Sequence, residues 1–309
     1  MPTAYFTHPV CLEHDPGPGH PESPARLVAV NEVLAKSEFD ALRRVRAPEA
    51  TREQLQRVHD GAYVASVLAA VPEEGYRSLD PDTVLSPASG EAALRAAGGV
   101  CVAVDLVAAG EAGNAFCAMR PPGHHAEAGQ AMGFCLFNNI AIGARHAQAV
   151  HGFGRVAVVD FDVHHGNGTQ HSFEEDASVF YASSHQWPAY PGTGATTETG
   201  VGNIVNVPLS PRAGSEEFRA AYDHVILPRL RDFRPDFLLV SAGFDAHERD
   251  PLAQLNVTTE DFAWISQALT EVAGNLCGGR LVSTLEGGYD LQALADSAAA
   301  HVHALIDGA

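Results

Sequence analysis

Positive charge, cysteine and long hydrophobic runs are all scarce in this sequence. Arginine and lysine number 19 against 38 acidic residues, which gives a formal net charge of −19, and Lys36 is the single lysine. Nucleic acids reward basic surfaces, so we expect no nucleic-acid partner. No segment approaches the ~18 consecutive apolar residues that a bilayer-spanning helix needs, so we also expect no membrane partner.

The five cysteines are odd in number, and no two of them have the C-x-x-C spacing. This pattern argues against a disulfide framework and against a structural zinc knuckle. It is typical of a reducing compartment. The amino terminus has no basic region followed by an apolar core, so we expect no signal peptide and a cytoplasmic location.

Apolar runs of strand length alternate with longer helical patterns along the chain, and no linker, repeat or low-complexity segment interrupts them. Strands are expected at 3–7, 114–119, 156–160, 178–183, 203–209, 237–241 and 280–285. Helices are expected at 26–35, 51–70, 90–110, 138–150, 215–230, 258–276 and 290–306, with a loop at 71–88. The alternation predicts an α/β fold with one doubly wound, mostly parallel sheet and helices on both faces. We expect a single domain over residues 1–309.

The most informative stretch runs from Val156 to Gly168, where a β-branched apolar run ends in acids, histidines and glycines. Asp162 and His164 are two positions apart, so on an extended backbone both point to one face. A carboxylate and an imidazole on one face suit a transition metal. A polar turn after a strand would have the same composition, so this stretch alone does not decide.

Polar residues also follow three other expected strands. His124 and His125 follow the strand at 114–119, Asp245 follows 237–241, and Tyr289 follows 280–285. Each has an ordinary explanation: a surface loop, a helix cap or a tight turn. In an open α/β sheet, however, the loops after the strands gather at one edge, so these residues should converge there.

Asp162, His164 and Asp245 would together offer one nitrogen and two carboxylate ligands. Three protein ligands with an open position describe a catalytic zinc site, which can polarise a water and a substrate carbonyl. The same ligands also suit Fe(II).

Hydrolysis further needs a base for water and an acid for the leaving group. His124 and His125 could share these tasks, with Asp160 and Asn167 holding their two ring Nδ1–H groups. The hydroxyl of Tyr289 could donate a hydrogen bond to a developing oxyanion.

Longer motifs in the chain resemble a known family, the zinc-dependent branch of the histone deacetylase superfamily with its arginase–deacetylase fold. They occur in the family order and cover most of the chain. The motifs are Arg120-Pro-Pro-Gly-His-His125, Gly133-Phe-Cys135, Asp160-Phe-Asp-Val-His-His-Gly-Asn-Gly-Thr-Gln170, Pro191-Gly-Thr-Gly194, Asn206-Val-Pro208, Ser241-Ala-Gly-Phe-Asp245, Asp250-Pro251 and Glu286-Gly-Gly-Tyr289. Asn167 stands where one branch has aspartate, so the chain is similar to class II enzymes and bacterial histone deacetylase-like amidohydrolases.

The resemblance implies the same three zinc ligands, with His125 as general base and acid and His124 as its electrostatic helper. It implies that Tyr289 donates to the oxyanion. The carbonyl of Gly133 would take the substrate amide N–H, and Phe134 and Tyr190 would wall an acyl-lysine tunnel.

Leu252 is the last expected substrate-binding residue, and some polyamine-specific members carry an acidic gatekeeper at this position. The resemblance also implies two potassium sites. The inner one would use Asp160, Asp162, His164, Ser183 and Ser184. The second, built mostly from backbone, would use Phe173, Asp176, Val179 and Asn203.

The expected function is zinc-dependent hydrolysis of an acyl amide, deacetylating acetyl-lysine-like substrates and releasing acetate. The alternatives are an acetylpolyamine deacetylase, a broad small-molecule amidohydrolase and, in another class, a catalytically silent binding protein. The expected partner is an acetylated lysine, a polyamine or a small amide. The sequence leaves open whether the protein forms homo-oligomers. The sequence does not determine the acyl-chain preference or the native metal.

Overall fold

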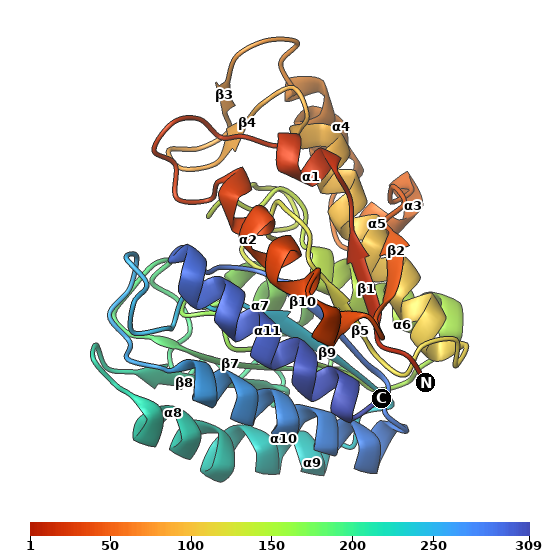
Figure 1. Ribbon diagram of the computed structural model, residues 1–309, viewed down its shortest axis with the longest axis vertical. Coiled ribbons are helices and arrows are strands. Elements are labelled where there is room, and N and C mark those ends of the chain that lie inside the picture. Colours follow the sequence, from red (N-terminus) through yellow and green to blue (C-terminus); the bar gives the residue numbers. More distant parts are fainter.

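An eight-stranded sheet forms the centre of the computed structural model, which describes residues 1–309 (Figure 1). The strand order is β2-β1-β5-β10-β9-β6-β7-β8, and every pairing is parallel. The strands are β1 (Ala4–Thr7), β2 (Arg43–Arg46), β5 (Ala115–Cys117), β6 (Val156–Asp160), β7 (Val179–Gln186), β8 (Ile204–Leu209), β9 (Phe237–Ala242) and β10 (Leu281–Leu285). The strands β3 (Arg77–Ser78) and β4 (Val84–Leu85) form a separate antiparallel pair.

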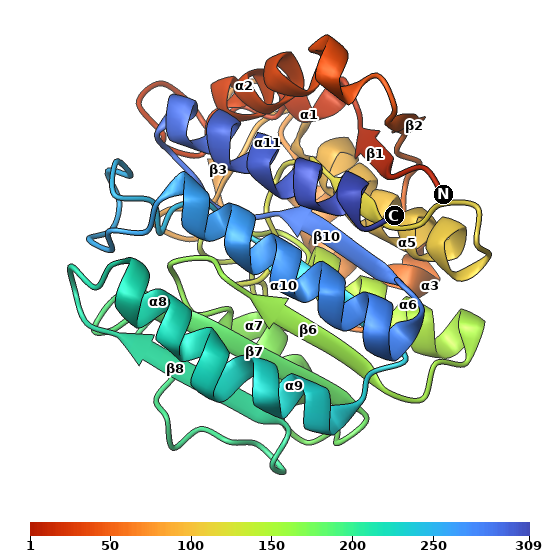
Figure 2. The same cartoon turned by 60° about the horizontal axis from the view of Figure 1, so that its bottom comes forward.

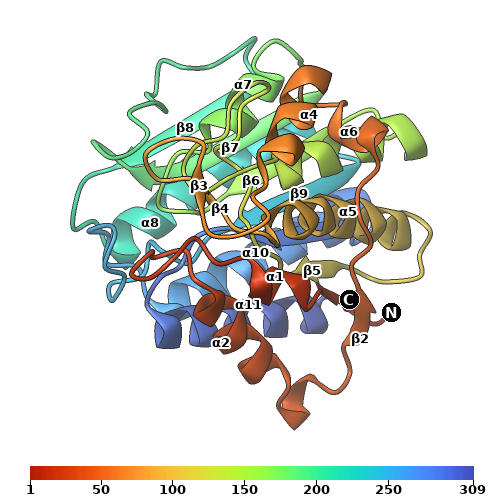
Figure 3. The same ribbon diagram turned by 90° about the horizontal axis from the view of Figure 1, so that it is seen from above.

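Helices cover both faces of the sheet. Figures 2 and 3 show α2, α10 and α11 on one face and α5 and α6 on the other. None of the helices combines the length and apolar character that crossing a bilayer would require. The helical segments are α1 (Val10–Glu13), α2 (Pro24–Leu34), the 3₁₀ turn η1 (Ser37–Phe39), α3 (Arg52–Leu55), α4 (Gly61–Ala70), α5 (Ser89–Ala108), α6 (Asn139–His151), α7 (Asn167–Phe173), α8 (Ser215–Ala221), the π-helical turn η2 (Tyr222–Ile226), α9 (Leu227–Phe233), α10 (Thr259–Cys277) and α11 (Leu291–Asp307).

The middle strands are buried along their whole length, which explains their continuous apolar sequences. In β6, Val156 lies opposite Val179 of β7 and Phe237 of β9. The same register brings Asp160, the last residue of β6, beside Ser183 and Ser241. The main hydrophobic core therefore ends in a polar row at the carboxyl edge of the sheet.

The start of α6 fixes the loop that carries the two adjacent histidines. Asn138 caps α6 by accepting a hydrogen bond from the backbone N–H of Ala141 at 3.1 Å. Its Nδ2 atom donates to the carbonyl of Ala126 at 3.3 Å. A Cβ atom at Gly123 would lie 2.5 Å from the backbone nitrogen of Asn139, so only glycine allows this close approach.

All seven predicted strands are present, and the sheet is entirely parallel where the sequence predicted a mostly parallel one. The expected helix at 51–70 is two helices, α3 and α4. Between them the chain turns, because Asp60 N–H donates to the carbonyl of Ala128 at 2.9 Å and His59 Nδ1 lies 2.9 Å from the carbonyl of Glu127.

The expected helix at 215–230 contains the π-helical turn η2. Pro228 lies just after this turn and has no N–H to donate to the carbonyl four residues back, so the regular α pattern is interrupted there. The expected loop at 71–88 contains the short strands β3 and β4. Strand β2 was not predicted, because it is an arginine-rich edge strand with alternating exposure.

Candidate active site

The loops that follow β5, β6, β7, β9 and β10 enclose a pocket of about 250 Å³ at the carboxyl edge of the sheet. The four residues expected to bind substrate all line it. The full lining is Asp82, Pro122, His124, His125, Gly133, Phe134, His164, Tyr190, Leu252, Gly287 and Tyr289. Asp82 belongs to the segment that the sequence marked only as loop.

The three expected metal ligands meet at the base of this pocket. His164 Nδ1 lies 3.1 Å from Asp162 Oδ1 and 3.1 Å from Asp245 Oδ2. Asp245 Oδ2 is buried and accepts no hydrogen bond, although His164 Nδ1 lies 3.1 Å away. A buried carboxylate oxygen that accepts no hydrogen bond needs an explanation, and a cation bound between Asp245 and His164 supplies one. One imidazole nitrogen and two carboxylates fit a divalent metal such as zinc.

Backbone N–H groups fix the orientation of both carboxylates. Gly287 N–H donates to Asp162 Oδ2 at 2.8 Å, and Val163 N–H donates to Asp245 Oδ1 at 2.8 Å. Burial alone would raise the pKa of Asp162, but the neighbouring His124 and His164 hold it below its ordinary value. A Cβ atom at Gly287 would lie 2.1 Å from Asp245 Oδ2, so glycine is required beside the ligands.

A second group of metal-ligand types, Asp105, His146 and His151, does not have the chemistry of a metal centre. Arg57 Nη1 lies 2.8 Å from His146 Nδ1, and an arginine can only donate. The hydrogen of neutral His146 therefore sits on Nε2, which lies 2.7 Å from Asp105 Oδ1. A metal ligand would need a free electron pair on that nitrogen.

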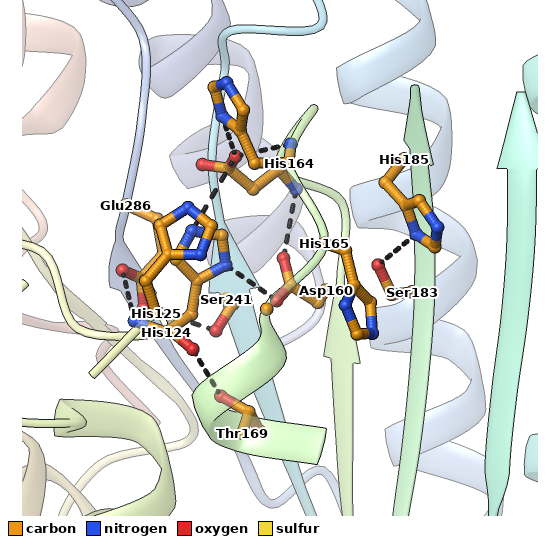
Figure 4. Close-up of polar contacts among 12 residues, drawn as sticks. His124, His125, Asp160, His164, His165, Thr169, Ser183, His185, Ser241 and Glu286 are labelled. Carbon is orange, nitrogen blue, oxygen red and sulfur yellow. Dashed lines mark hydrogen bonds and ion pairs between the residues drawn. The ribbon is translucent and has the colours of Figure 1, made fainter. Parts of the chain in front are cut away.

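The two adjacent histidines have different partners. His124 Nδ1 lies 3.0 Å from Asp160 Oδ2, and His125 Nδ1 lies 2.8 Å from Asn167 Oδ1. Figure 4 shows the contact between His124 and Asp160 beside His164. Asp160 is itself held by Tyr181, whose hydroxyl donates to Asp160 Oδ2 at 3.1 Å.

These surroundings favour opposite charge states for the two rings. Burial works against a charge on His124, but the carboxylates of Asp160 and Asp162 outweigh it and raise the pKa of His124 to about 10. Burial and the charges of His124 and His164 hold the pKa of His125 well below its ordinary 6.5. His124 is therefore suited to carry a charge and His125 to accept a proton.

Glu286 lies beside the histidine loop and holds it by hydrogen bonds (Figure 4). Its Oε2 atom accepts hydrogen bonds from the N–H groups of Gly123 at 2.7 Å and His124 at 3.2 Å. Its Oε1 atom accepts from Ser241 Oγ at 3.2 Å. Burial raises the pKa of Glu286 to about 7. The sequence placed Glu286 in a motif but gave it no role.

Tyr289 is held by two residues to which the sequence reasoning gave no role. The guanidinium of Arg26 lies over its ring, 4.8 Å from the centroid, and donates to the carbonyl of Gly288 at 2.5 Å. The N–H of Tyr289 donates to Asp250 Oδ2 at 2.7 Å. The only sequence signal was that Asp250 belongs to one of the family-like motifs. Arg26 gave none.

The pocket wall is built on strained backbone. Gly133 and Phe134 both have positive φ angles, 57° and 68°. A Cβ atom at Gly133 would lie 2.4 Å from the ring of His125. Two contacts from the loop before α5 support this conformation: Gly133 N–H donates to Asp82 Oδ1 at 3.2 Å, and Phe134 N–H donates to Thr83 Oγ1 at 3.1 Å.

Aromatic rings narrow the pocket. The ring of Tyr190 meets that of His125 edge-on, with centroids 5.1 Å apart, and the ring of Phe134 meets that of Tyr289 edge-on at 6.0 Å. Leu252 lies at the rim with 42% of its surface exposed. Aromatic and aliphatic side chains therefore narrow the pocket toward its mouth, where Asp82 is also present, and the base is polar.

The residues expected to bind the inner potassium ion lie next to one another beneath the metal-ligand group. Ser183 is paired in register with Asp160, and Ser184 Oγ lies 2.9 Å from the hydroxyl of Tyr222. The Tyr222 hydroxyl is also 3.5 Å from the carbonyl of Asp160. This oxygen-rich group suits a hard cation, and the ion itself stays a prediction.

The four residues of the expected second potassium site also lie together, with an amide nitrogen among their carbonyls. The Nδ2 atom of Asn203 donates to the carbonyls of Phe173 at 2.8 Å, Asp176 at 3.0 Å and Val179 at 2.7 Å. The amide nitrogen thus takes the place on which the three carbonyls converge. The potassium ion expected there stays a prediction, in which the ion and the Asn203 amide compete for the same three carbonyls.

Comparisons with known proteins agree with this geometry. Residues 20–305 match the family described as "Histone deacetylase domain". The chain is 40% identical to the histone deacetylase-like amidohydrolase of Pseudomonas aeruginosa over 310 residues, which cover 93% of this chain and 81% of that protein. It is 37% identical to a probable deacetylase of Archaeoglobus fulgidus over 299 residues, covering 94% and 82%.

A solved structure extends the likeness to the fold. The crystal structure of the HDA15 HD domain superposes with a TM-score of 0.94 at 39% identity, covering 99% of this chain and 88% of that one. The parallel sheet is accordingly that of the arginase–deacetylase fold. With the family match over nearly its whole length, this chain belongs to the histone deacetylase domain family.

Proposed function

We propose that this chain is a zinc-dependent amidohydrolase that removes acetate from acetyl-lysine-like substrates. The observation that carries the proposal is the buried Asp245 Oδ2, which accepts no hydrogen bond and lies with Asp162 and His164 at the base of a pocket lined by aromatic rings. The donor set fits a zinc ion, and the pocket fits a linear acyl chain.

When bound at Asp162, His164 and Asp245, zinc would supply Lewis acidity toward water and the substrate carbonyl. His125 would take the proton of the attacking water, because its surroundings keep the ring neutral. It would then give that proton to the amine as the amide C–N bond breaks, so that acetate and a free amine leave.

The remaining residues would stabilise charge. His124, held by the Asp160 carboxylate, would place a positive charge beside the reacting centre. Tyr289 lines the same pocket, and its hydroxyl would donate a hydrogen bond to the oxyanion as it forms. Gly133, Phe134 and Tyr190 would hold the substrate chain, with the Gly133 carbonyl accepting the amide N–H.

The test is a panel of acetyl-lysine peptides, acetylspermidine and simple amides, assayed with the zinc-loaded and Fe(II)-loaded protein. We expect acetate release from the peptides, and we expect Asp245→Ala to lose both metal and turnover. Turnover that survives Asp245→Ala with unchanged zinc content would refute the metal-dependent mechanism. A zinc-loaded protein that is inert on the whole panel would favour a binding protein without activity.

Acetylpolyamine deacetylation is the second candidate, and the net charge of −19 favours a cationic substrate. Leu252 at the rim argues against this candidate, because it offers no carboxylate to a polyamine ammonium group. Asp82, the one carboxylate among the pocket-lining residues, accepts a hydrogen bond from Gly133 N–H. The ratio of kcat/KM on acetylspermidine to kcat/KM on an acetyl-lysine peptide separates the two candidates. The cytoplasmic location and the single-domain organisation over residues 1–309 stay predictions.

A further inference from the structure

A carboxylate lies directly behind the residue that holds His125. The Nδ2 atom of Asn167 donates to Glu127 Oε1 and, at 3.2 Å, to the backbone carbonyl of His125. The Oδ1 atom of Asn167 faces His125 Nδ1 at 2.8 Å. Asn167 therefore links the ring of His125 to Glu127, with its amide nitrogen on the Glu127 side and its oxygen on the histidine side.

The direction in which the Asn167 amide points decides which ring nitrogen of His125 is free. With Oδ1 toward the ring, Nδ1 must carry the hydrogen, and Nε2 keeps the electron pair that a general base needs. A 180° flip has almost the same shape but would present the amide N–H₂ group to Nδ1. Nε2 would then carry the hydrogen, and His125 could not accept a proton from water.

Glu127 can hold only one of these two orientations. An ionised carboxylate is an acceptor and not a donor, so it binds the N–H₂ group and rejects the amide oxygen. Glu127 is itself held by His171, whose Nδ1 lies 2.8 and 2.9 Å from the two carboxylate oxygens. Asn167 and His171 are one turn apart on α7, so a single helix presents both partners to Glu127.

Glu127 lies outside the substrate pocket. It lines a separate cavity of about 240 Å³ together with Arg57, Arg145 and His171. Glu127 does not line the substrate pocket, so an effect of this residue on turnover would be indirect, and its direct contact on the side of the active site is Asn167.

We propose that Glu127 is a positioning residue that fixes the amide orientation of Asn167 and, through it, the tautomer of His125. The proposal rests on the proposed function, in which His125 is the general base. It adds a residue that touches neither the metal ligands nor the substrate pocket.

The decisive variants exchange donors and acceptors. Glu127→Lys puts a donor where the acceptor was, so the Asn167 amide should flip, and kcat should fall by about 10²-fold or more, as for loss of a general base. Glu127→Lys combined with Asn167→Asp should recover most of kcat, because an aspartate accepts hydrogen bonds from both the introduced ammonium group and the His125 ring. Glu127→Gln can donate as well as accept, so it should select the Asn167 orientation less strictly and give a kcat between those of the wild type and Glu127→Lys.

The matched control is Glu175→Lys, which makes the same charge change at an exposed position just after α7. It should leave kcat unchanged. Zinc content and the melting temperature of every variant show whether the fold and metal site are intact. A double variant no more active than Glu127→Lys would overturn the proposal.

The tautomer of His125 can be read independently of turnover by ¹⁵N nuclear magnetic resonance of the histidine side chains. We expect the Nδ1–H form in the wild type, a mixture of the two forms in Glu127→Gln, and the Nε2–H form in Glu127→Lys. An unchanged tautomer in Glu127→Lys would refute the role of Glu127. If the wild type hydrolyses no acyl amide while the tautomer still follows residue 127, the proposed function fails and the positioning role stands.

Discussion

His124 and His125 lie with their ring centroids 4.1 Å apart, yet each directs Nδ1 to a different kind of acceptor. His124 faces the Asp160 carboxylate, and His125 faces the Asn167 amide oxygen. A carboxylate stabilises an imidazolium ion more strongly than a neutral amide oxygen does. Two neighbouring rings of the same chemical type are thereby given different charge states, as an acid–base pair requires.

This difference predicts the acid side of the pH profile. Burial and the charge of His124 lower the pKa of His125, and a bound dication would move it in the same direction. Since the protonated ring is the inactive form, kcat/KM should decline only when the pH falls well below 6.5. The profile should be measured from about pH 4.5 to about pH 8 on zinc-loaded protein, with the metal content checked at each pH.

A variant of the neighbouring histidine tests what lowers the pKa of His125. His124→Gln removes a positive charge beside His125, so it should raise the pKa of His125 and move the acid limb of the remaining activity toward 6.5. An acid limb that stays in place, or moves to lower pH, would show that His124 does not set the charge state of His125.

Tyr289→Phe should separate metal binding from catalysis. The phenylalanine ring can keep its position under the Arg26 guanidinium, which lies 4.8 Å from the ring centroid. Only the hydroxyl is lost, so zinc content should stay at the wild-type level. The kcat should fall by roughly 10²–10³-fold, the typical effect of removing one oxyanion donor. Near-normal turnover would mean that another group stabilises the oxyanion.

The positions of the three expected metal ligands were predictable, because each ligand lies in a loop that directly follows a parallel strand. Once Val156–Asp160 and Phe237–Ala242 are recognised as parallel strands, the residues after them must meet at one edge of the sheet. Asp162, His164 and Asp245 do meet there. The periodicity of the sequence is sufficient for this level of prediction.

The supporting residues were not predictable in the same way. Arg26 reaches Tyr289 from helix α2, and nothing in the pattern of that helix indicates which side chain turns inward. Glu127 acts on Asn167 through a contact between positions 40 residues apart. Such contacts depend on side-chain directions that become defined only when the loops pack together. The Asn203 side chain is a further example, because the sequence does not show that its amide nitrogen lies among the three carbonyls.

Glu22→Gln should destabilise the fold strongly near neutral pH. Glu22 is buried between two buried arginines, with Arg120 Nη2 2.6 Å from Oε2 and Arg26 Nη1 2.9 Å from Oε1. Removing the anion leaves two buried cations without their partner, which costs about 3–5 kcal/mol. Urea unfolding at neutral pH measures this loss. Glu111→Gln breaks the exposed pair with Arg43 and should cost no more than about 1 kcal/mol.

The pH dependence of this loss has a definite sign. Burial alone would raise the pKa of Glu22, but Arg120 and Arg26 hold it well below the unfolded value of 4.5. The carboxylate therefore contributes its full stability above pH 4.5 and loses it as the pH falls toward the folded-state pKa. The difference between the wild type and Glu22→Gln should narrow below pH 4.5. If the difference in unfolding free energy between the two proteins grew at acid pH, the lowered pKa of Glu22 would be contradicted.

Asn203→Ala should create a potassium response that the wild type lacks at this position. In the wild type, Asn203 Nδ2 satisfies the carbonyls of Phe173, Asp176 and Val179. Without the amide, these carbonyls lose their donor, and the free energy of unfolding should fall by about 1–3 kcal/mol. Converging backbone carbonyls can replace the hydration shell of K⁺, so KCl should restore part of the stability.

The measurement is the melting temperature in KCl and in choline chloride at equal ionic strength. The control is Asn206→Ala, which removes another buried amide, one that donates to Gln170 Oε1 at 2.7 Å and touches none of the three carbonyls. An ion at the inner site would contribute to the wild type and to Asn203→Ala alike, so its effect cancels between these two proteins. The KCl-dependent gain should be larger in Asn203→Ala than in the wild type or Asn206→Ala. Equal gains in all three proteins would show that the Asn203 amide does not stand in for a cation.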